Sequence, residues 1–141
     1  MSTRVVIIGS TGKLGSKLLT YAFKNSISIY GICCYKNSKK LSTQSKKYSI
    51  NNSFVLSKEK DQNNFFKILE KKIHILYFLD YGSNSLKYLE YFLRYNKNSN
   101  IAVANKELII AGGSLLQLKI KKTKNNFIPL DSEHFSLLNS N

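Results

Sequence analysis

The first stretch of the sequence that could do chemistry is a glycine-rich turn, Gly9-Ser10-Thr11-Gly12-Lys13-Leu14-Gly15. It follows the apolar run 5–8 and precedes apolar residues at helical spacing. Glycines permit a tight turn and a close approach of backbone to ligand, and free N–H groups at a helix start attract phosphate. We therefore expect this turn to face the pyrophosphate of a dinucleotide. The alternative is a plain glycine-rich connection between a strand and a helix.

The residues after the second expected strand bear on which dinucleotide binds. Units that bind NAD place Asp or Glu there to hold the ribose 2′-hydroxyl. This chain has Cys34-Tyr35-Lys36-Asn37, which contains no acid and offers a cation. A cation suits a 2′-phosphate, so the pattern favours NADP(H). Because Lys is abundant throughout the chain, Lys36 also fits the general composition.

Two polar motifs follow later apolar strands, at the end of a parallel sheet where ligands bind. The first is Asn105-Lys106-Glu107, and the second is Asp131-Ser132-Glu133-His134. Carboxylates two residues apart, as in the second motif, are natural oxygen ligands for Mg²⁺ or Mn²⁺. The alternative is that both motifs are helix N-caps, with an acid in the first turn, and that Lys106 is a surface charge.

These motifs need strands and helices to position them, and the hydrophobic pattern predicts both. Apolar runs predict strands at 5–8, 27–33, 53–56, 73–79, 101–104 and 127–130. Helical spacing predicts helices from residue 14, over 64–71, over 86–95 and from 106, the last interrupted by Gly112-Gly113. The Lys-rich segment 36–52 reads as a linker-like region. Alternating strands and helices predict an α/β fold, a doubly wound parallel sheet of Rossmann type in a single domain.

The charge of the chain raises the question of a nucleic-acid partner. Twenty-two Lys and Arg stand against eight Asp and Glu, for a net charge of +14. However, only Arg4 and Arg94 are Arg, whereas nucleic-acid recognition favours the planar fork of Arg. The abundance of Lys, Asn, Ile and Tyr is typical of an AT-rich genome, so we favour compositional drift over nucleic-acid binding.

The cysteines and the apolar runs indicate the compartment. Cys33 and Cys34 are adjacent on an expected strand, so their side chains point to opposite faces and predict neither a disulfide nor a metal pair. No apolar run is long enough for a membrane span, and no signal peptide precedes the glycine turn. We expect a cytoplasmic protein with no membrane association, or one in a plastid-type organelle after processing.

Together, the motifs resemble the N-terminal part of 1-deoxy-D-xylulose 5-phosphate reductoisomerase. The matching residues are Gly9-Ser10-Thr11-Gly12-x-x-Gly15, Lys36-Asn37, Ala104-Asn105-Lys106-Glu107 and Pro129-x-Asp131-Ser132-Glu133-His134. The last two motifs are far more specific than the glycine turn. The resemblance covers essentially the whole chain but only the first part of the family's length.

The resemblance implies an enzyme that uses NADPH and a divalent metal. It would convert 1-deoxy-D-xylulose 5-phosphate to 2-C-methyl-D-erythritol 4-phosphate in non-mevalonate isoprenoid biosynthesis, and the full-length family implies a homodimer. By matched position, the substrate would contact Lys106, Ser132 and Glu133, and Mg²⁺ or Mn²⁺ would bind Asp131 and Glu133. The cofactor would contact Gly9, Ser10, Thr11, Gly12, Lys13, Leu14, Lys36, Asn37, Asn105 and Glu107.

The resemblance also divides the chain and exposes departures. Residues 1–128 would form the NADPH-binding domain, and residues 129–141 would begin the metal- and substrate-binding domain. The family commonly has a small residue at the position of Lys13 and glycine at that of Tyr35. Its later substrate-phosphate motif, third metal carboxylate and lid have no counterpart here, so we expect this chain alone to be catalytically incomplete.

Three alternatives to the reductoisomerase remain open at this point. The first is a non-catalytic remnant that keeps only nucleotide binding. The second is a basic nucleic-acid-binding protein built on a Rossmann core. The third is another NAD(P)-dependent Rossmann reductase, such as a homoserine dehydrogenase-like protein, although the motif Asp131–His134 argues against it.

Overall fold

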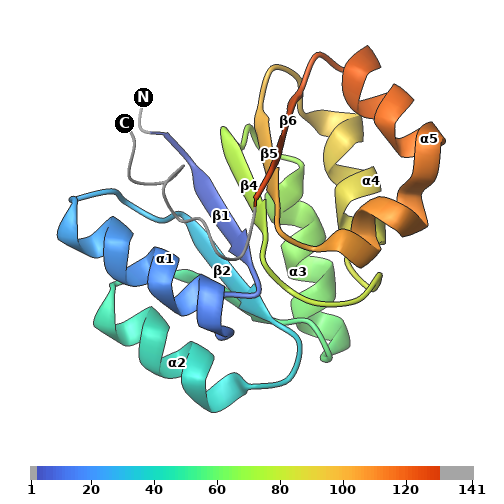
Figure 1. Ribbon diagram of the computed structural model, residues 1–141. Helices are drawn as coiled ribbons and strands as arrows, with labels where there is room; N and C mark the ends of the chain where they lie inside the picture. Colours follow the sequence, from blue (N-terminus) through green and yellow to red (C-terminus); the bar gives the residue numbers. More distant parts are fainter. Residues whose placement is uncertain (1–2, 131–141) are drawn as a thin grey trace.

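The computed structural model describes residues 3–130, which form a parallel β-sheet with helices on both faces (Figure 1). Its strands are β1 (Val5–Ile8), β2 (Gly31–Cys34), β3 (Asn52–Val55), β4 (Ile75–Phe78), β5 (Asn100–Val103) and β6 (Asn126–Pro129). Its helices are α1 (Lys13–Lys24), α2 (Ser38–Lys47), α3 (Glu59–Leu69), α4 (Leu86–Tyr95) and α5 (Lys106–Lys122). Strands and helices alternate along the chain, as the hydrophobic pattern predicted.

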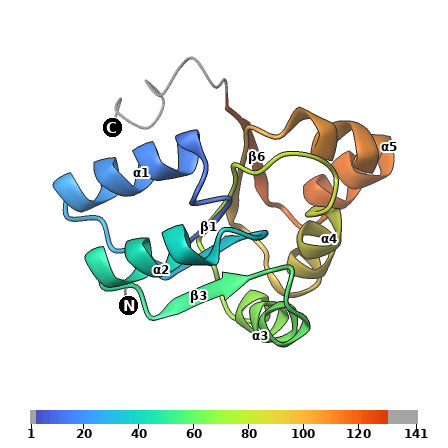
Figure 2. The same cartoon turned by 90° about the horizontal axis from the view of Figure 1, so that it is seen from below.

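The sheet has the strand order β3-β2-β1-β4-β5-β6, and every neighbouring pair is parallel. This is the order of a doubly wound dinucleotide-binding sheet, in which successive strands are added on one side of β1 up to β3 and on its other side from β4 onward. Helices α1 and α2 cover one face, and α3, α4 and α5 cover the other (Figures 1 and 2). The predicted fold class is therefore confirmed, and this reversal of the strand order places a crevice at the carboxyl ends of β1 and β4.

Strand β1 is buried on both faces because it lies in the middle of the sheet. Its four residues are all β-branched and all buried. Ile7 joins the core cluster beneath α1 and α2, whereas Val6 and Ile8 join the cluster beneath α3, α4 and α5. Cys33 and Cys34 divide in the same way and are both free thiols, so the prediction of opposite faces and no disulfide is confirmed.

The prediction of a linker-like segment over residues 36–52 is wrong, because α2 occupies most of it. Leu41 is its one buried apolar side chain, and it packs in the core cluster beneath α1 and α2. The helix begins after Asn37, whose side-chain Oδ1 accepts a hydrogen bond from the N–H of Lys40 at 3.2 Å. A helix with so narrow an apolar face has no clear periodic signal, and its Lys-rich exposed face resembles a solvated loop.

Two further elements begin at other residues than the sequence predicted. Helix α3 begins at Glu59 rather than at Asn64, because its first turn is polar and the apolar pattern cannot reveal it. The carboxylate of Asp61 in that turn accepts a hydrogen bond from the N–H of Val55 at 2.7 Å, which ties α3 to β3. Strand β2 begins at Gly31 rather than at Ile27.

The predicted interruption of α5 at Gly112-Gly113 is confirmed. Gly113 has φ 60° and ψ −158°, a conformation that breaks the helix and that side chains rarely allow. The kink turns Leu116 and Ile120 into the core while Leu115 and Leu118 stay exposed. Within residues 3–130, no helix has the length and apolar character needed to cross a membrane.

One buried polar contact ties α2 to the turn after β1. The Oγ of Ser10 donates to Oε1 of Gln44 at 2.9 Å, and Nε2 of Gln44 donates to the carbonyl oxygen of Ser10 at 2.8 Å. Ser10 is fully buried and Gln44 is 7% exposed. This reciprocal pair satisfies polar groups that would otherwise be buried without partners.

We expect Gln44→Ala to lower the free energy of unfolding by about 1–3 kcal/mol, because it leaves the buried hydroxyl of Ser10 without an acceptor and the carbonyl oxygen of Ser10 with only the 3.4 Å hydrogen bond from Ser16. Thr43→Ala on the exposed side of the same helix removes only a local hydrogen bond and should change little. Urea unfolding of the two variants measures the difference. Equal losses for both variants would contradict a specific role for the Ser10–Gln44 pair.

Candidate dinucleotide site

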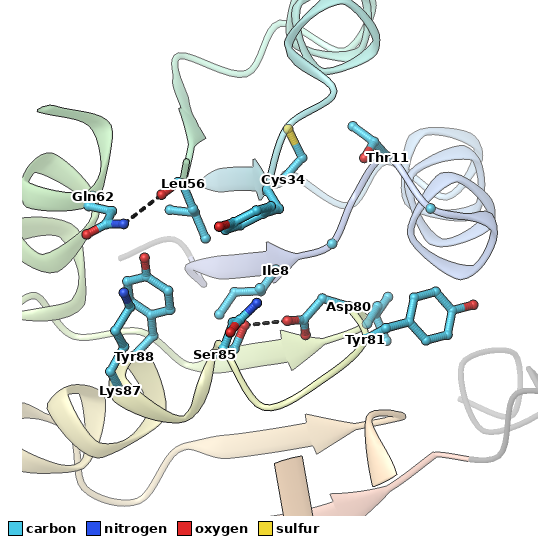
Figure 3. A pocket seen from close by; sticks show the side chains of 15 residues that line it. Ile8, Thr11, Cys34, Leu56, Gln62, Asp80, Tyr81, Ser85, Lys87 and Tyr88 are labelled. Atoms are coloured by element: carbon cyan, nitrogen blue, oxygen red, sulfur yellow. Dashed lines mark hydrogen bonds between the residues drawn. The ribbon is translucent and has the colours of Figure 1, made fainter. Parts of the chain in front are cut away.

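A cavity of about 360 Å³ opens at the carboxyl ends of β1, β2 and β4, where the strand order reverses (Figure 3). The turn after β1 contributes Gly9, Thr11 and Gly12 to its lining. The end of β2 contributes Cys34 and Tyr35. The remaining lining comes from the start of α3, from the loop after β4 and from α4. Ligands of open α/β sheets bind in this type of crevice.

Two of the three glycines in the turn are required by the close packing of the backbone. A Cβ on Gly9 would lie 2.6 Å from the backbone nitrogen of Asp80, and Gly9 also has a φ of +93°. A Cβ on Gly15 would lie 2.2 Å from the carbonyl oxygen of Gly9. In contrast, a Cβ on Gly12 would meet only that same oxygen at 3.6 Å, an ordinary contact. Folding therefore explains Gly9 and Gly15 but not Gly12.

Gly12 instead leaves the start of α1 open toward the cavity. It is the N-cap residue of α1 and has no side chain to cap the helix. The first N–H groups of an α-helix have no partner inside the helix, and the helix dipole makes this end positive. The first turn holds no acidic residue, and the exposed Lys13 adds a positive charge. This arrangement fits a pyrophosphate, which takes backbone N–H donors at a helix start.

The other predicted residues of the turn face elsewhere. Ser10 directs its hydroxyl to Gln44 and its N–H to the carbonyl oxygen of Cys33 at 3.2 Å. Leu14 packs against the core cluster beneath α1 and α2. The structure thus brings Gly9, Thr11 and Gly12 to the cavity and uses Ser10 and Leu14 to hold the turn in place.

At the end of β2, an aromatic ring and a cation lie beside the cavity. Tyr35 lines the cavity and is 53% exposed. The Nζ of Lys36 lies 5.8 Å from the centroid of the Tyr35 ring, within the range of a cation–π contact. Asn37 is exposed, and its side chain caps α2. A positive charge beside an aromatic ring suits an adenosine that carries a 2′-phosphate.

Asn105 is buried and connects two loops. Its Oδ1 accepts a hydrogen bond from the N–H of Leu108 at 3.1 Å, so it caps α5. Its Nδ2 donates to the carbonyl oxygen of Gly82 at 2.7 Å and to Oδ1 of Asp80 at 3.3 Å. Lys106 and Glu107 are exposed at the start of α5. Asn105 therefore fixes the loop after β4 relative to α5.

Asp80 is a cavity residue that the sequence analysis missed. It is the first polar residue after the apolar run of β4, so the rule that singled out Asn105 applies to it equally. Its Oδ2 accepts a hydrogen bond from the hydroxyl of Ser85 (Figure 3). Burial raises the pKa of the Asp80 carboxyl above its ordinary value, and the hydrogen bonds from Ser85 and Asn105 oppose that shift.

Tyr88 and Gln62 complete the wall formed by α4 and α3, and neither was predicted. Tyr88 is 2% exposed, and burial raises the pKa of its hydroxyl to about 12. Gln62 donates from Nε2 to the carbonyl oxygen of Leu56 at 2.8 Å. Both residues lie on helices whose apolar faces had been assigned only to the core, so no sequence signal marked them.

The predicted metal motif, with Asp131, Ser132 and Glu133, lies outside the described residues. Within residues 3–130, no group of three His, Cys, Asp or Glu side chains is placed to hold a metal ion. The metal ligands therefore stay a prediction from the sequence.

Residues 5–91, more than half of the 141-residue chain, match the family of 1-deoxy-D-xylulose 5-phosphate reductoisomerase. The chain belongs to this family. The family's enzyme from Pelagibacter ubique is 34% identical over 95% of this chain and 39% of its own length. That from Thermoanaerobacter pseudethanolicus is 28% identical over 96% of this chain and 40% of its own length. The chain therefore spans about 40% of the length of these relatives.

Solved structures of the family share the fold. The Zymomonas mobilis enzyme in complex with NADPH superposes with a TM-score of 0.78 at 18% identity, over 95% of this chain and 40% of that one. A second family structure, in complex with NADPH, fosmidomycin and magnesium, also has a TM-score of 0.78, at 19% identity over 94% of this chain and 37% of that one. At these identities the likeness shows the fold.

We expect Gly15→Ala to lower the free energy of unfolding by about 1–3 kcal/mol, because the new methyl group would overlap the backbone of Gly9 and Ser10. Gly12→Ala places its methyl group in ordinary contact and should cost clearly less. Thermal unfolding of both variants measures the comparison. A Gly12→Ala loss as large as that of Gly15→Ala would contradict the packing described for the turn.

Proposed function

We propose that this chain forms the NADPH-binding part of a 1-deoxy-D-xylulose 5-phosphate reductoisomerase. The observation that carries the proposal is the cavity between β1 and β4, bounded by an uncapped helix start, in a chain of this family. Gly12 has no packing reason to be glycine, whereas a ligand phosphate at the start of α1 would need its space. One related structure is a complex with NADPH, and another also contains fosmidomycin and magnesium.

In this proposal, the two halves of the cofactor lie on the two sides of β1. Thr11, Gly12 and the N–H groups that open α1 hold the pyrophosphate. The adenosine lies toward β2, where Lys36 and Asn37 meet its 2′-phosphate beside Tyr35. The nicotinamide half lies toward β4 and the start of α5, where the proposal places Asn105 and Glu107. NADPH bound in this way supplies a hydride, and the chain's own residues bind and orient it.

The proposal also covers the substrate, the metal and the assembly of the protein. Lys106, Ser132 and Glu133 contact the substrate, 1-deoxy-D-xylulose 5-phosphate. Asp131 and Glu133 are ligands of Mg²⁺ or Mn²⁺, whose chemistry in such sites is Lewis-acid polarisation of substrate oxygens. The product is 2-C-methyl-D-erythritol 4-phosphate, a step of isoprenoid biosynthesis. A homodimer and a cytoplasmic or plastid-type location belong to the same proposal.

Titration of the chain with NADPH and with NADH tests the cofactor assignment. We expect the unmodified chain to bind NADPH more tightly than NADH. Lys36→Ala should lower the affinity for NADPH by about tenfold and leave the affinity for NADH nearly unchanged, because the ammonium pairs only with the 2′-phosphate. Lys47→Ala is the matched control, since Lys47 also lies over a tyrosine ring, that of Tyr48 at 5.4 Å. Intrinsic cofactor fluorescence reports binding in each case.

Equal affinities of the unmodified chain for the two cofactors would overturn the role of Lys36. Binding of neither cofactor would overturn the proposed function itself.

The metal ligands have a separate test. We expect Asp131→Asn to weaken Mn²⁺ binding by about tenfold or more, because Mn²⁺ prefers anionic oxygen ligands. Glu59→Gln removes an exposed carboxylate from the first turn of α3 and serves as the control. Electron paramagnetic resonance of free Mn²⁺ measures both affinities. If Asp131→Asn and Glu59→Gln bind Mn²⁺ equally well, the motif caps a helix and holds no metal.

A further inference from the structure

Asp80 places a carboxylate in the cavity on the far side of β1 from Lys36. It follows β4 directly, and β4 is the neighbour of β1 opposite to β2. Its backbone touches the phosphate turn, because a Cβ on Gly9 would lie 2.6 Å from the Asp80 nitrogen and 2.7 Å from the carbonyl carbon of Leu79. Figure 3 shows the carboxyl group turned toward Ser85 within the cavity wall.

This carboxylate is held in position but is not neutralised. The hydroxyl of Ser85 donates to Oδ2, and Nδ2 of Asn105 donates to Oδ1 at 3.3 Å. Both donors are uncharged, and the ion pair found within residues 3–130 joins Lys119 and Glu90 elsewhere. An ionised carboxylate has about four lone-pair positions, so about two remain for donors that enter the cavity.

The chemistry of the cofactor limits which of its groups can donate hydrogen bonds to the Asp80 carboxylate. The pyrophosphate carries negative charge and would be repelled by a carboxylate. A ribose diol is neutral and donates hydrogen bonds, and Rossmann units that bind NAD hold the ribose next to adenine with an acid after their second strand. Here β2 ends in Cys34 and is followed by Tyr35 and Lys36, so that acid is missing. The acid of this cavity lies after β4 instead.

We propose that Asp80 accepts hydrogen bonds from the hydroxyl groups of the ribose attached to nicotinamide. The inference rests on the proposed function, which places the adenosine toward β2 and the other nucleoside toward β4. Ser85 and Asn105 position this carboxylate, because each donates a hydrogen bond to one of its two oxygens. Asp80 fixes the second ribose and thereby the nicotinamide ring that the ribose carries.

The test compares ligands that differ only in this half of the cofactor. NADPH and 2′-phospho-ADP-ribose both carry the second ribose, whereas adenosine 2′,5′-bisphosphate lacks it. We expect Asp80→Ala to lower the affinity for NADPH and for 2′-phospho-ADP-ribose by about tenfold to a hundredfold, the effect of losing hydrogen bonds to a charged group. The affinity for adenosine 2′,5′-bisphosphate should stay unchanged. Isothermal titration calorimetry with the full chain measures all three affinities.

Two further variants separate binding from folding. Glu90→Gln removes an exposed carboxylate outside the cavity, so all three affinities should stay unchanged. Ser85→Ala removes one hydrogen bond to the Asp80 carboxylate but leaves the carboxylate in place. The affinity for NADPH should therefore fall less than in Asp80→Ala. Thermal unfolding of each variant with no ligand present shows whether a loss of affinity reflects a loss of folded protein.

The outcomes distinguish this inference from the proposed function. Unchanged or tighter binding of NADPH by Asp80→Ala would overturn the role of Asp80 and leave NADPH binding intact. A parallel loss of all three ligands would assign Asp80 a structural role only. Failure of the unmodified chain to bind any of the three ligands would overturn the proposed function and the inference with it.

Discussion

The contact of backbone with backbone at the turn after β1 is the constraint on which the rest of the site depends. A Cβ on Gly15 would lie only 2.2 Å from the carbonyl oxygen of Gly9. A Cβ on Gly9 would lie 2.6 Å from the backbone nitrogen of Asp80. The start of α1, the end of β1 and the end of β4 therefore meet with no room for a side chain between them. This contact aims the first N–H groups of α1 at the crevice where the strand order reverses.

Buried polar side chains hold the surrounding loops against this centre. Gln44 ties α2 to the turn through Ser10, and Asn105 ties α5 to the loop after β4 through Asp80 and Gly82. The Ser10–Gln44 link satisfies fully buried groups, and the Asn105 link satisfies partly buried ones. The cavity is consequently asymmetric. Tyr35 lines it at the end of β2, with Lys36 over the tyrosine ring, and the carboxylate of Asp80 lines it after β4. A dinucleotide with a phosphorylated adenosine and a neutral second ribose matches that asymmetry.

Prediction from the sequence succeeded where one element carries its own signal. The bounds of β1 and α4 were predicted correctly, because β1 is an unbroken β-branched run and α4 has a regular apolar face. Prediction failed for α2, whose only buried apolar residue, Leu41, gives no periodicity. Prediction also failed for Asp80. This acid stands alone after β4, whereas an acid was expected only after β2 and polar ligand motifs only after the later strands.

The sequence by itself determined the strand–turn–helix unit, the doubly wound fold and the family, because these depend on local periodicity and on motifs read in order. Only the tertiary structure decided which partners the polar side chains have. The sequence marks Ser10 and Asn105 as candidate cofactor contacts, and the structure shows in addition that their side chains bond to Gln44 and to the loop after β4. The physical reason is that a side chain's partners come from segments distant in sequence. No local pattern at Ser10 records that Gln44, on a helix that begins after the second strand, lies against it.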